Sequence, residues 1–354
     1  MSRVKLGDVA QEYKATVKDC SNLPIVGLEH LTPGEITLER WDEGTENTFT
    51  KGFKKGQMLF GRRRAYLKKA AVAPIDGVCS GDITVIEAIP GKILPELLPF
   101  IIQNDLLFDY AVGKSAGSLS PRVKWVDLKD YEFELPEIEK QASLVDLLKA
   151  AHATRKAYQE QIKATDDLVK SQFIEMFGDP NNNANTVSFE TAFTIRDDLR
   201  KPINDSVRSE MHENAMYPYY GANGQVDTIN QYLMDCTALC LAEDCGAYGA
   251  GEASSYIVSG KCWVNNHAHV IIPKECCDLH YANAFFKILD MTPYVSGSTR
   301  LKLTQGKMKE IPVVLPSIGE QMKFAAIVKQ SDKSKLLIEY TVRKIRRFQY
   351  VYGS

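Results

Sequence analysis

The chain has 354 residues, of which 44% are hydrophobic and 25% charged, and its formal net charge is −2. This length suits two domains of about 100–200 residues each, and the composition is typical of globular protein rather than disordered, collagenous or membrane-embedded chains. No run approaches the roughly 18 apolar residues of a membrane span, and residues 1–8 lack the apolar segment of a secretory signal, so we expect a cytoplasmic protein without a membrane partner.

Eight cysteines occur in the chain, and six of them lie in its second half near three histidines. Without a secretory signal, free thiols in a reducing compartment are favoured over disulfides. The cysteines include no C-x-x-C pair of the kind that structural zinc sites use. We expect no metal, with a zinc site in the second half as the open alternative.

Residues 1–137 are predicted to form a first domain with a strand at 83–86 and a helix at 97–102. The stretch from Lys51 to Lys69 within it holds eight basic residues and no acidic one. This stretch is therefore a local basic patch inside a domain that is otherwise close to neutral.

Two long helices are predicted, one in residues 138–180 and one in residues 321–354. In the first, from Ile138 to Phe177, an apolar stripe ends near Met176, before Gly178-Asp179-Pro180 stops the helix. Its residues are Leu144, Leu148, Ala151, Tyr158, Ile162 and Val169, and the matching stripe of the second helix is Phe324, Ile327, Ser331, Ile338, Val342, Ile345 and Phe348. The first helix is about 60 Å long at 1.5 Å per residue. Because each apolar stripe is narrow, an antiparallel two-helix coil is the economical arrangement, and packing of each helix on its own domain is the alternative.

Residues 181–320, between these helices, are predicted to form a second domain that repeats the first. Leu135-Pro136 with Gln141 recurs as Leu315-Pro316 with Gln321, a shift of 180 residues that also preserves the helical register. A strand at 268–271 and a helix at 283–288 parallel those of the first domain. The fold class is therefore α+β, with two similar mixed α/β domains separated by two long antiparallel helices.

In these features the chain resembles the DNA-specificity subunits of type I restriction-modification systems. The resemblance is carried by the Leu-Pro motif and its copy, by the helix end at 171–180 (SQFIEMFGDP), and by the segment 217–224 (YPYYGANG). It spans essentially the whole chain and implies a pseudo-twofold repeat of two target-recognition domains. Each domain would read one half of a split, asymmetric DNA sequence.

The resemblance also implies partners and a division of labour. The helices would set the length of the unread spacer and dock two modification subunits that methylate adenine, and two restriction subunits can join such complexes. S-adenosylmethionine would then be bound by the modification subunits, and ATP and magnesium by a restriction subunit. This chain would bind double-stranded DNA, hold no cofactor and catalyse nothing itself.

Motifs of catalysis are scarce in the sequence, which agrees with that implication. There is no G-x-x-x-x-G-K-[ST] loop and no Asp/Asn-Pro-Pro-Tyr/Phe tetrapeptide, and the glycine-rich segment 246–251 lacks the G-x-G-x-x-G spacing. The alternative to DNA recognition is a non-catalytic coiled-coil adaptor that presents two globules to protein partners. A steep salt dependence of DNA affinity separates the two, because counterion release accompanies phosphate binding.

In the first domain we expect DNA contacts from two segments. Arginine side chains fit both phosphate and the guanine edge, and a Gly/Ser-rich loop lets the backbone approach phosphates. The alternatives are a solvated basic loop and a plain turn. The candidate residues are Arg62, Arg63, Arg64 and Tyr66 in the basic stretch, and Lys114, Ser115, Ser118, Arg122 and Lys124 in the loop.

The second domain should read DNA differently, because Glu243-Asp244 stand near the place of the arginine run. Asn and Gln side chains suit bidentate contact with adenine. Core packing of one of the tyrosines, and a tight turn at Asn223-Gly224, are the alternatives. The candidates are Tyr219, Tyr220, Asn223, Gln225, Asn265, Asn266, His267, Ser298, Thr299, Arg300 and Lys302.

Overall fold

The computed structural model describes residues 2–20, 22–44, 48–117, 119–297 and 301–352, with side chains as far as residue 344. The chain forms two compact units, one of Met1–Tyr158 with Tyr340–Ser354 and one of Gln159–Glu339. The limits predicted from the sequence, at residues 137, 180 and 320, divide the chain in another way, because they separate the long helices from the globular domains. That division stays a prediction. Within the described ranges, no helix is long and apolar enough to cross a membrane.

The first unit is built on three small sheets. Four strands form an antiparallel sheet in the order β2-β8-β5-β6, three form a mixed sheet in the order β3-β7-β4, and β1 pairs with β9. The strands are β1 (Ser2–Lys5), β2 (Ala10–Glu12), β3 (Ile25–Val26), β4 (Lys51–Phe53), β5 (Met58–Gly61), β6 (Ala70–Val72), β7 (Gly77–Cys79), β8 (Ile83–Ala88) and β9 (Glu132–Leu135).

Short helices complete the first unit. Asn104 begins one of them as its N-cap, since its side-chain oxygen accepts a hydrogen bond from the Leu106 amide at 2.9 Å. Phe60 of the sheet stacks on Phe108 of that helix, with ring centroids 5.5 Å apart. The helices are α1 (Leu6–Val9), the 3₁₀ turn η1 (Ala65–Leu67), α2 (Leu98–Ile102), α3 (Asp105–Gly113) and α4 (Trp125–Leu128).

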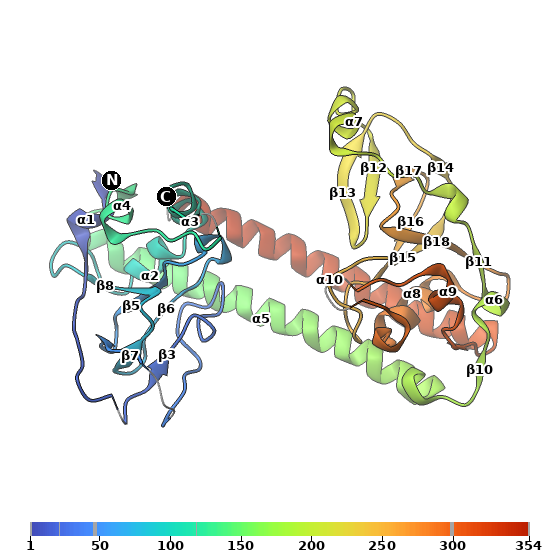
Figure 1. The fold of residues 1–354 in the computed structure, drawn as a ribbon, viewed down its shortest axis with the longest axis horizontal. Coiled ribbons are helices and arrows are strands. Elements are labelled where there is room, and N and C mark those ends of the chain that lie inside the picture. The colour runs from blue at the N-terminus through green and yellow to red at the C-terminus, as the bar shows by residue number, and fades with distance from the viewer. Residues whose placement is uncertain (1, 21, 45–47, 118, 298–300, 353–354) are drawn as a thin grey trace. The chain divides into compact units, whose positions relative to one another are not determined.

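The second unit repeats this topology. Its antiparallel sheet has the order β11-β18-β15-β16, its mixed sheet contains β12-β17-β14, and β10 pairs with β19. The strands, of which Figure 1 labels β10 to β18, are β10 (Thr186–Val187), β11 (Phe193–Ile195), β12 (Tyr217–Gly221), β13 (Gly224–Ile229), β14 (Met234–Asp235), β15 (Ala238–Ala242), β16 (Ser255–Val258), β17 (Lys261–Val264), β18 (Ala268–Pro273) and β19 (Val313–Val314).

The match extends to strand direction. In both mixed sheets one pair is parallel, β3 with β7 and β12 with β17, and the pairs of β4 with β7 and of β14 with β17 are antiparallel. The second unit adds β13, which pairs with β12 in a hairpin. The predicted fold class of two similar mixed α/β domains is therefore confirmed.

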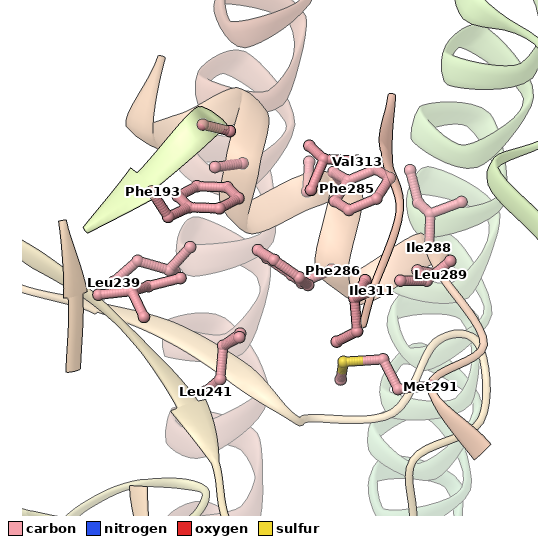
Figure 2. Close-up of a cluster of buried hydrophobic side chains, with 14 of the residues drawn as sticks. Phe193, Leu239, Leu241, Phe285, Phe286, Ile288, Leu289, Met291, Ile311 and Val313 are labelled. Atoms are coloured by element: carbon pink, nitrogen blue, oxygen red, sulfur yellow. The ribbon is translucent and has the colours of Figure 1, made fainter. Parts of the chain in front are cut away.

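Aromatic side chains fill the core of the second unit. Phe285 and Phe286 of α8 (Leu279–Ile288) lie against Phe193 and Leu239 of the sheet, and Ile311 and Val313 close the cluster (Figure 2). The remaining helices and 3₁₀ turns are η2 (Pro180–Asn182), α6 (Phe189–Ala192), η3 (Asp197–Leu199), α7 (Asp205–Glu210), η4 (Thr292–Tyr294) and α9 (Gln305–Lys309).

Both predicted long helices are present, as α5 (Ile138–Phe177) and α10 (Ile318–Tyr352). Gly178 ends α5 with a φ of 86°, a conformation that glycine adopts without strain. Within the second unit the helices run antiparallel, since Phe173 packs on Phe324 at 5.4 Å between centroids and Lys335 Nζ lies 2.7 Å from Asp166 Oδ1.

A buried glutamine fixes the start of each long helix to its own unit. Gln141 Oε1 accepts from the Leu94 amide at 2.8 Å, and its Nε2 donates to the Pro136 carbonyl at 3.0 Å. Gln321 repeats both bonds, with the Asp278 amide and the Pro316 carbonyl, each at 2.8 Å. The glutamines of the repeated motif are thus structural anchors, exposed by only 1% and 0%.

Candidate nucleic-acid interface

The two candidate segments of the first unit lie against each other. Arg62 directly follows β5, and its carbonyl accepts from the Val123 amide at 3.0 Å. The Arg64 amide donates to the Pro121 carbonyl at 2.8 Å, and Arg63 forms a bridge with Arg122. The basic stretch and the Gly/Ser-rich loop, more than fifty residues apart in the sequence, therefore form one surface.

A carboxylate on the neighbouring strand organises this surface. Asp82 precedes β8 and receives Arg122 in a fork, with Nε 2.7 Å from Oδ1 and Nη2 3.2 Å from Oδ2. Arg63 approaches the same carboxylate at 3.5 Å and donates to Ser120 Oγ at 3.0 Å. We call Arg63, Asp82, Ser120 and Arg122 the Asp82 cluster. Hydrogen bonding from Arg122 holds the pKa of Asp82 below its ordinary value.

The Asp82 cluster changes the interpretation of Arg122. Its guanidinium is paired with Asp82, and its Nη1 also donates to the Ser120 carbonyl at 3.4 Å, so Arg122 positions the loop. Ser115 likewise donates its hydroxyl to the Ala111 carbonyl at 2.7 Å and completes the end of α3. Both were predicted as DNA contacts, which stays a prediction, and both have an intramolecular partner.

Other candidates of the first unit remain open to solvent. Arg64 is exposed and holds a left-handed φ of 53°, Tyr66 is 54% exposed, and Lys114 and Lys124 are exposed. Arg62 is half-buried, and its Nε has no hydrogen-bond partner among the described residues. Ser118 lies outside the described residues.

In the second unit, Tyr219 is part of the hydrophobic core. Its ring is 1% exposed among Met211, Ile229 and Trp263, and Arg208 covers its face at 5.5 Å. We therefore remove Tyr219 from the DNA contacts predicted from the sequence, because a buried ring cannot reach a base. Tyr220 is half-buried and stacks on Tyr256 at 5.6 Å between centroids.

The turn between β12 and β13 presents the polar candidates. Asn223 and Gln225 are exposed on either side of Gly224. Gly224 has a φ of 123°, a conformation that glycine adopts without strain because it has no Cβ. Asn223 Nδ2 donates to the Ala253 carbonyl at 2.8 Å, which fixes the turn to a neighbouring loop. The tight turn at Asn223-Gly224 is therefore the same segment that exposes the polar side chains of Asn223 and Gln225.

A second polar turn lies beside this hairpin. The Asn265 amide donates to the Tyr220 carbonyl at 3.0 Å, and Asn265 itself is buried and caps the turn by accepting from the His267 amide at 2.8 Å. Asn266 is exposed, and His267 Nδ1 lies 2.8 Å from Asp244 Oδ1. Asn265 is therefore a turn-forming residue, whereas Asn266 and His267 face the surface.

Behind that turn lies a polar network that the sequence did not reveal. Glu243 accepts from Arg200 and pairs with Lys302 Nζ at 2.7 Å. His269, 1% exposed, lies between Asp197 Oδ2 at 2.7 Å and the Leu303 carbonyl at 2.8 Å. We call Asp197, Arg200, Glu243, His269 and Lys302 the Glu243 cluster.

Burial and hydrogen bonding oppose each other in the Glu243 cluster. Burial alone raises the pKa of Glu243, but hydrogen bonds from Lys302 and Arg200 outweigh it and hold that pKa below its ordinary value. Burial also acts to raise the pKa of Asp197, and the hydrogen bond from His269 and the charge of Arg200 lower it overall. Both carboxyls are therefore ionised partners of the basic side chains around them.

Of the candidate DNA contacts in the second Gly/Ser-rich loop, Lys302 lies within the described residues. It forms a bridge with Ser296 that matches the bridge between Ala116 and Arg122 in the first unit. Ser298, Thr299 and Arg300 lie outside the described residues. Like Arg122, Lys302 is paired with a carboxylate, but Asp82 precedes β8 whereas Glu243 follows β15, so the two loops are held by carboxylates on different strands.

No metal-binding group is apparent in the described ranges, where no three His, Cys, Asp and Glu side chains form a cluster suited to an ion. All eight cysteines are free thiols. Burial raises the pKa of Cys277 to about 12 and that of Cys262 to about 11. These thiols therefore remain protonated at neutral pH.

Comparison with known proteins shows a family similarity in the second half of the chain. Residues 199–345 match the family described as type I restriction modification DNA specificity domain. Over 137 residues the chain is 30% identical to a putative type I restriction enzyme specificity subunit, S.HindORF215P, of Haemophilus influenzae, covering 38% of this chain and 34% of that protein. The EcoDI specificity subunit of Escherichia coli is 24% identical over 168 residues, which are 45% of this chain and 35% of that subunit. The matches thus span about a third of each relative.

Solved structures extend the similarity of fold to nearly the whole chain. A chain from a study of complex assembly and conformational transition of the type I R-M system has a TM-score of 0.52 at 17% identity, covering 99% of this chain and 96% of that one. The type I restriction-modification S subunit from M. genitalium has a TM-score of 0.53 at 12% identity, covering 99% and 94%. Residues 199–345 thus resemble the DNA specificity domain of type I restriction-modification systems, and nearly the whole chain shares the fold of these solved structures.

Proposed function

We propose that this chain is the sequence-specific DNA-recognition subunit of a type I restriction-modification complex. Residues 1–137 and 181–320 each read one half of a bipartite, asymmetric target in double-stranded DNA. The helices in 138–180 and 321–354 set the unread spacer and dock two modification subunits. The chain acts in the cytoplasm and performs no chemistry of its own.

One structural observation supports the proposal independently of the similarity to known proteins. Each unit displays a loop of the Gly/Ser-rich repeat beside the end of the same sheet strand, held there by a basic side chain on a carboxylate: Arg122 on Asp82, and Lys302 on Glu243. A shared scaffold with different exposed side chains suits two readers of different sequences. Phosphate contacts would supply affinity, and base edges in the major groove would supply specificity.

The candidate DNA contacts are the predicted residues whose side chains are exposed to solvent, together with partly buried neighbours. In the first unit they are Arg64, Tyr66, Lys114 and Lys124, with Arg62 and Arg63 beside them. In the second unit they are Asn223, Gln225, Asn266, His267 and Lys302, with Tyr220 at their edge. S-adenosylmethionine belongs in this proposal to the modification subunits, and ATP and magnesium to a restriction subunit where the system has one.

The test is single-molecule methylation sequencing of DNA from cells that express this chain with its modification subunit. The expected result is methyladenine in both halves of an asymmetric motif with a fixed gap. An assembled complex that leaves no such motif, or whose DNA affinity does not fall with salt, would support the adaptor alternative instead.

A further inference from the structure

Leu119 is the most solvent-exposed large apolar side chain in the described part of the chain, with 91% of its surface accessible. The next are Leu336 and Leu337, at 68% each. An isolated exposed leucine is common on protein surfaces, so exposure alone assigns no role. The surroundings of Leu119 set it apart.

The turn that carries Leu119 is held firmly at its base. Ala116 and Arg122 exchange two backbone hydrogen bonds of 3.0 Å, and the bridge between Arg122 and Arg63 adds a third segment. Arg63 also donates to Ser120 Oγ, next to the leucine, at 3.0 Å. Leu119 lies in the chain between Ala116 and Arg122, the two residues that close this turn.

The charge around the turn that carries Leu119 is positive. Residues 111–126 contain Lys114, Arg122 and Lys124 and no acidic residue, and Arg64 lies beside Pro121. Asp82, the carboxylate nearest the base of the turn, is neutralised by Arg122 and Arg63. An apolar side chain within a basic surround is complementary to a DNA groove, where phosphates flank base edges.

We infer that Leu119 enters the DNA major groove and contacts the 5-methyl group of a thymine in the half of the target read by the first unit. The major groove is about 12 Å wide and admits an α-helix, so it also admits a turn closed by one pair of residues. A leucine can neither donate nor accept a hydrogen bond, and the thymine methyl is the apolar feature among the base edges there. Leu119 is thus a specificity-determining residue, an assignment that rests on the proposed function.

The experiment uses the complex of this chain with its modification subunits and duplexes that carry the methylated motif. Each thymine of the first half is replaced in turn by deoxyuridine, which lacks only the methyl group. With the wild-type chain, one replacement should slow methylation about fivefold to tenfold, the lower range of a single mismatch. Leu119→Ala should cause the same loss on the unmodified duplex, and deoxyuridine at that position should cause no further loss.

Met216→Ala is the matched control, because Met216 is 67% exposed in the second unit and lies outside the candidate contacts. It should leave the deoxyuridine effect intact. Thermal unfolding of Leu119→Ala should match that of the wild type, since the side chain buries little surface.

The outcomes separate this inference from the proposed function. A wild-type complex without a bipartite motif would overturn both. A bipartite motif with no deoxyuridine effect, or with losses that multiply in Leu119→Ala, would overturn the role of Leu119 alone. Failure of Leu119→Ala to assemble with the modification subunits would make the leucine a protein contact, which also contradicts the inference.

Discussion

Glu243 occupies in the second unit the backbone position that Arg62 occupies in the first. The Arg62 amide donates to the Asp82 carbonyl at 2.9 Å, and its carbonyl accepts from the Val123 amide at 3.0 Å. The Glu243 amide donates to the His267 carbonyl and its carbonyl accepts from the Leu303 amide, both at 2.8 Å. The same position thus carries a cation in one unit and a carboxylate in the other, as the proposed reading of two different half-targets requires.

Removing the charge of Glu243 should weaken the second unit selectively. Glu243→Gln leaves Arg200 and Lys302 without their shared carboxylate, and we expect a loss of roughly 1–3 kcal/mol in the free energy of unfolding. Methylation should become less selective for the second half of the target and stay unchanged for the first. Glu252→Gln, at an exposed position, is the control and should alter neither quantity.

The acid sensitivity of the second unit should depend on the same carboxyl. The folded-state pKa values of Glu243 and Asp197 lie below their ordinary values of 4.5 and 3.8, so the unfolded chain takes up protons first as the pH falls. Their stabilisation is full above those ordinary values and is lost as the pH falls through the folded values. Denaturant titrations from about pH 7 to about pH 3.5 should show a smaller loss for Glu243→Gln than for the wild type. Equal losses would contradict the assignment.

The Asp82 cluster should matter for the first half of the target. Asp82→Asn removes the carboxylate that holds Arg122 and Arg63, so the 116–122 turn should lose its fixed position. We expect methylation to weaken at the first half and the second half to be read as before, with the motif determined by sequencing. A uniform loss of discrimination in both halves would instead indicate global unfolding, which circular dichroism would detect.

The exposed basic residues should act through phosphates. Arg64→Ala and Lys114→Ala should each lower DNA affinity for all sequences and reduce the slope of log affinity against log salt by about one. The measurement is a salt titration of DNA binding by the assembled complex. Unchanged slopes would show that these side chains stay in water when DNA binds.

The glutamine anchors give a prediction about stability alone. Gln141→Leu leaves the Leu94 amide and the Pro136 carbonyl without partners, and we expect it to cost about 2–4 kcal/mol for two buried polar groups. Gln321→Leu should cost a similar amount in the second unit. Gln330→Leu, at an exposed position of α10, should change the unfolding midpoint little.

The long helices and the repeat could be predicted from the sequence because both rest on local signals. The apolar period and Gly178-Asp179-Pro180 predicted a helix over 138–177, the range that α5 covers. The buried residues Phe324, Ser331 and Ile338 lie on the predicted stripe of the second helix. By contrast, Phe173, which packs on Phe324, was not on the stripe predicted for α5.

The details of the site depend on long-range register, which local patterns do not carry. The pairing of Gly61 with Ile83 brings Asp82 beside Arg62 and Arg122, and the pairing of Ala242 with Ala268 brings Glu243 beside His267. Without those registers, Arg122 and Ser115 were interpreted as free contacts. For Tyr219 and Tyr220, core packing of one of the two was the alternative to DNA contact, and Tyr219 is the one that is buried.

The most direct test of the central claim, that each unit reads its own half of the target, is methylation sequencing of a chimeric chain. Residues 1–137 are replaced by the corresponding segment of another specificity subunit with a known, different target, and the complex is expressed with its modification subunits. The account predicts that one half of the motif changes, whereas the other half and the gap stay as in the wild type. A motif in which both halves change together would contradict it.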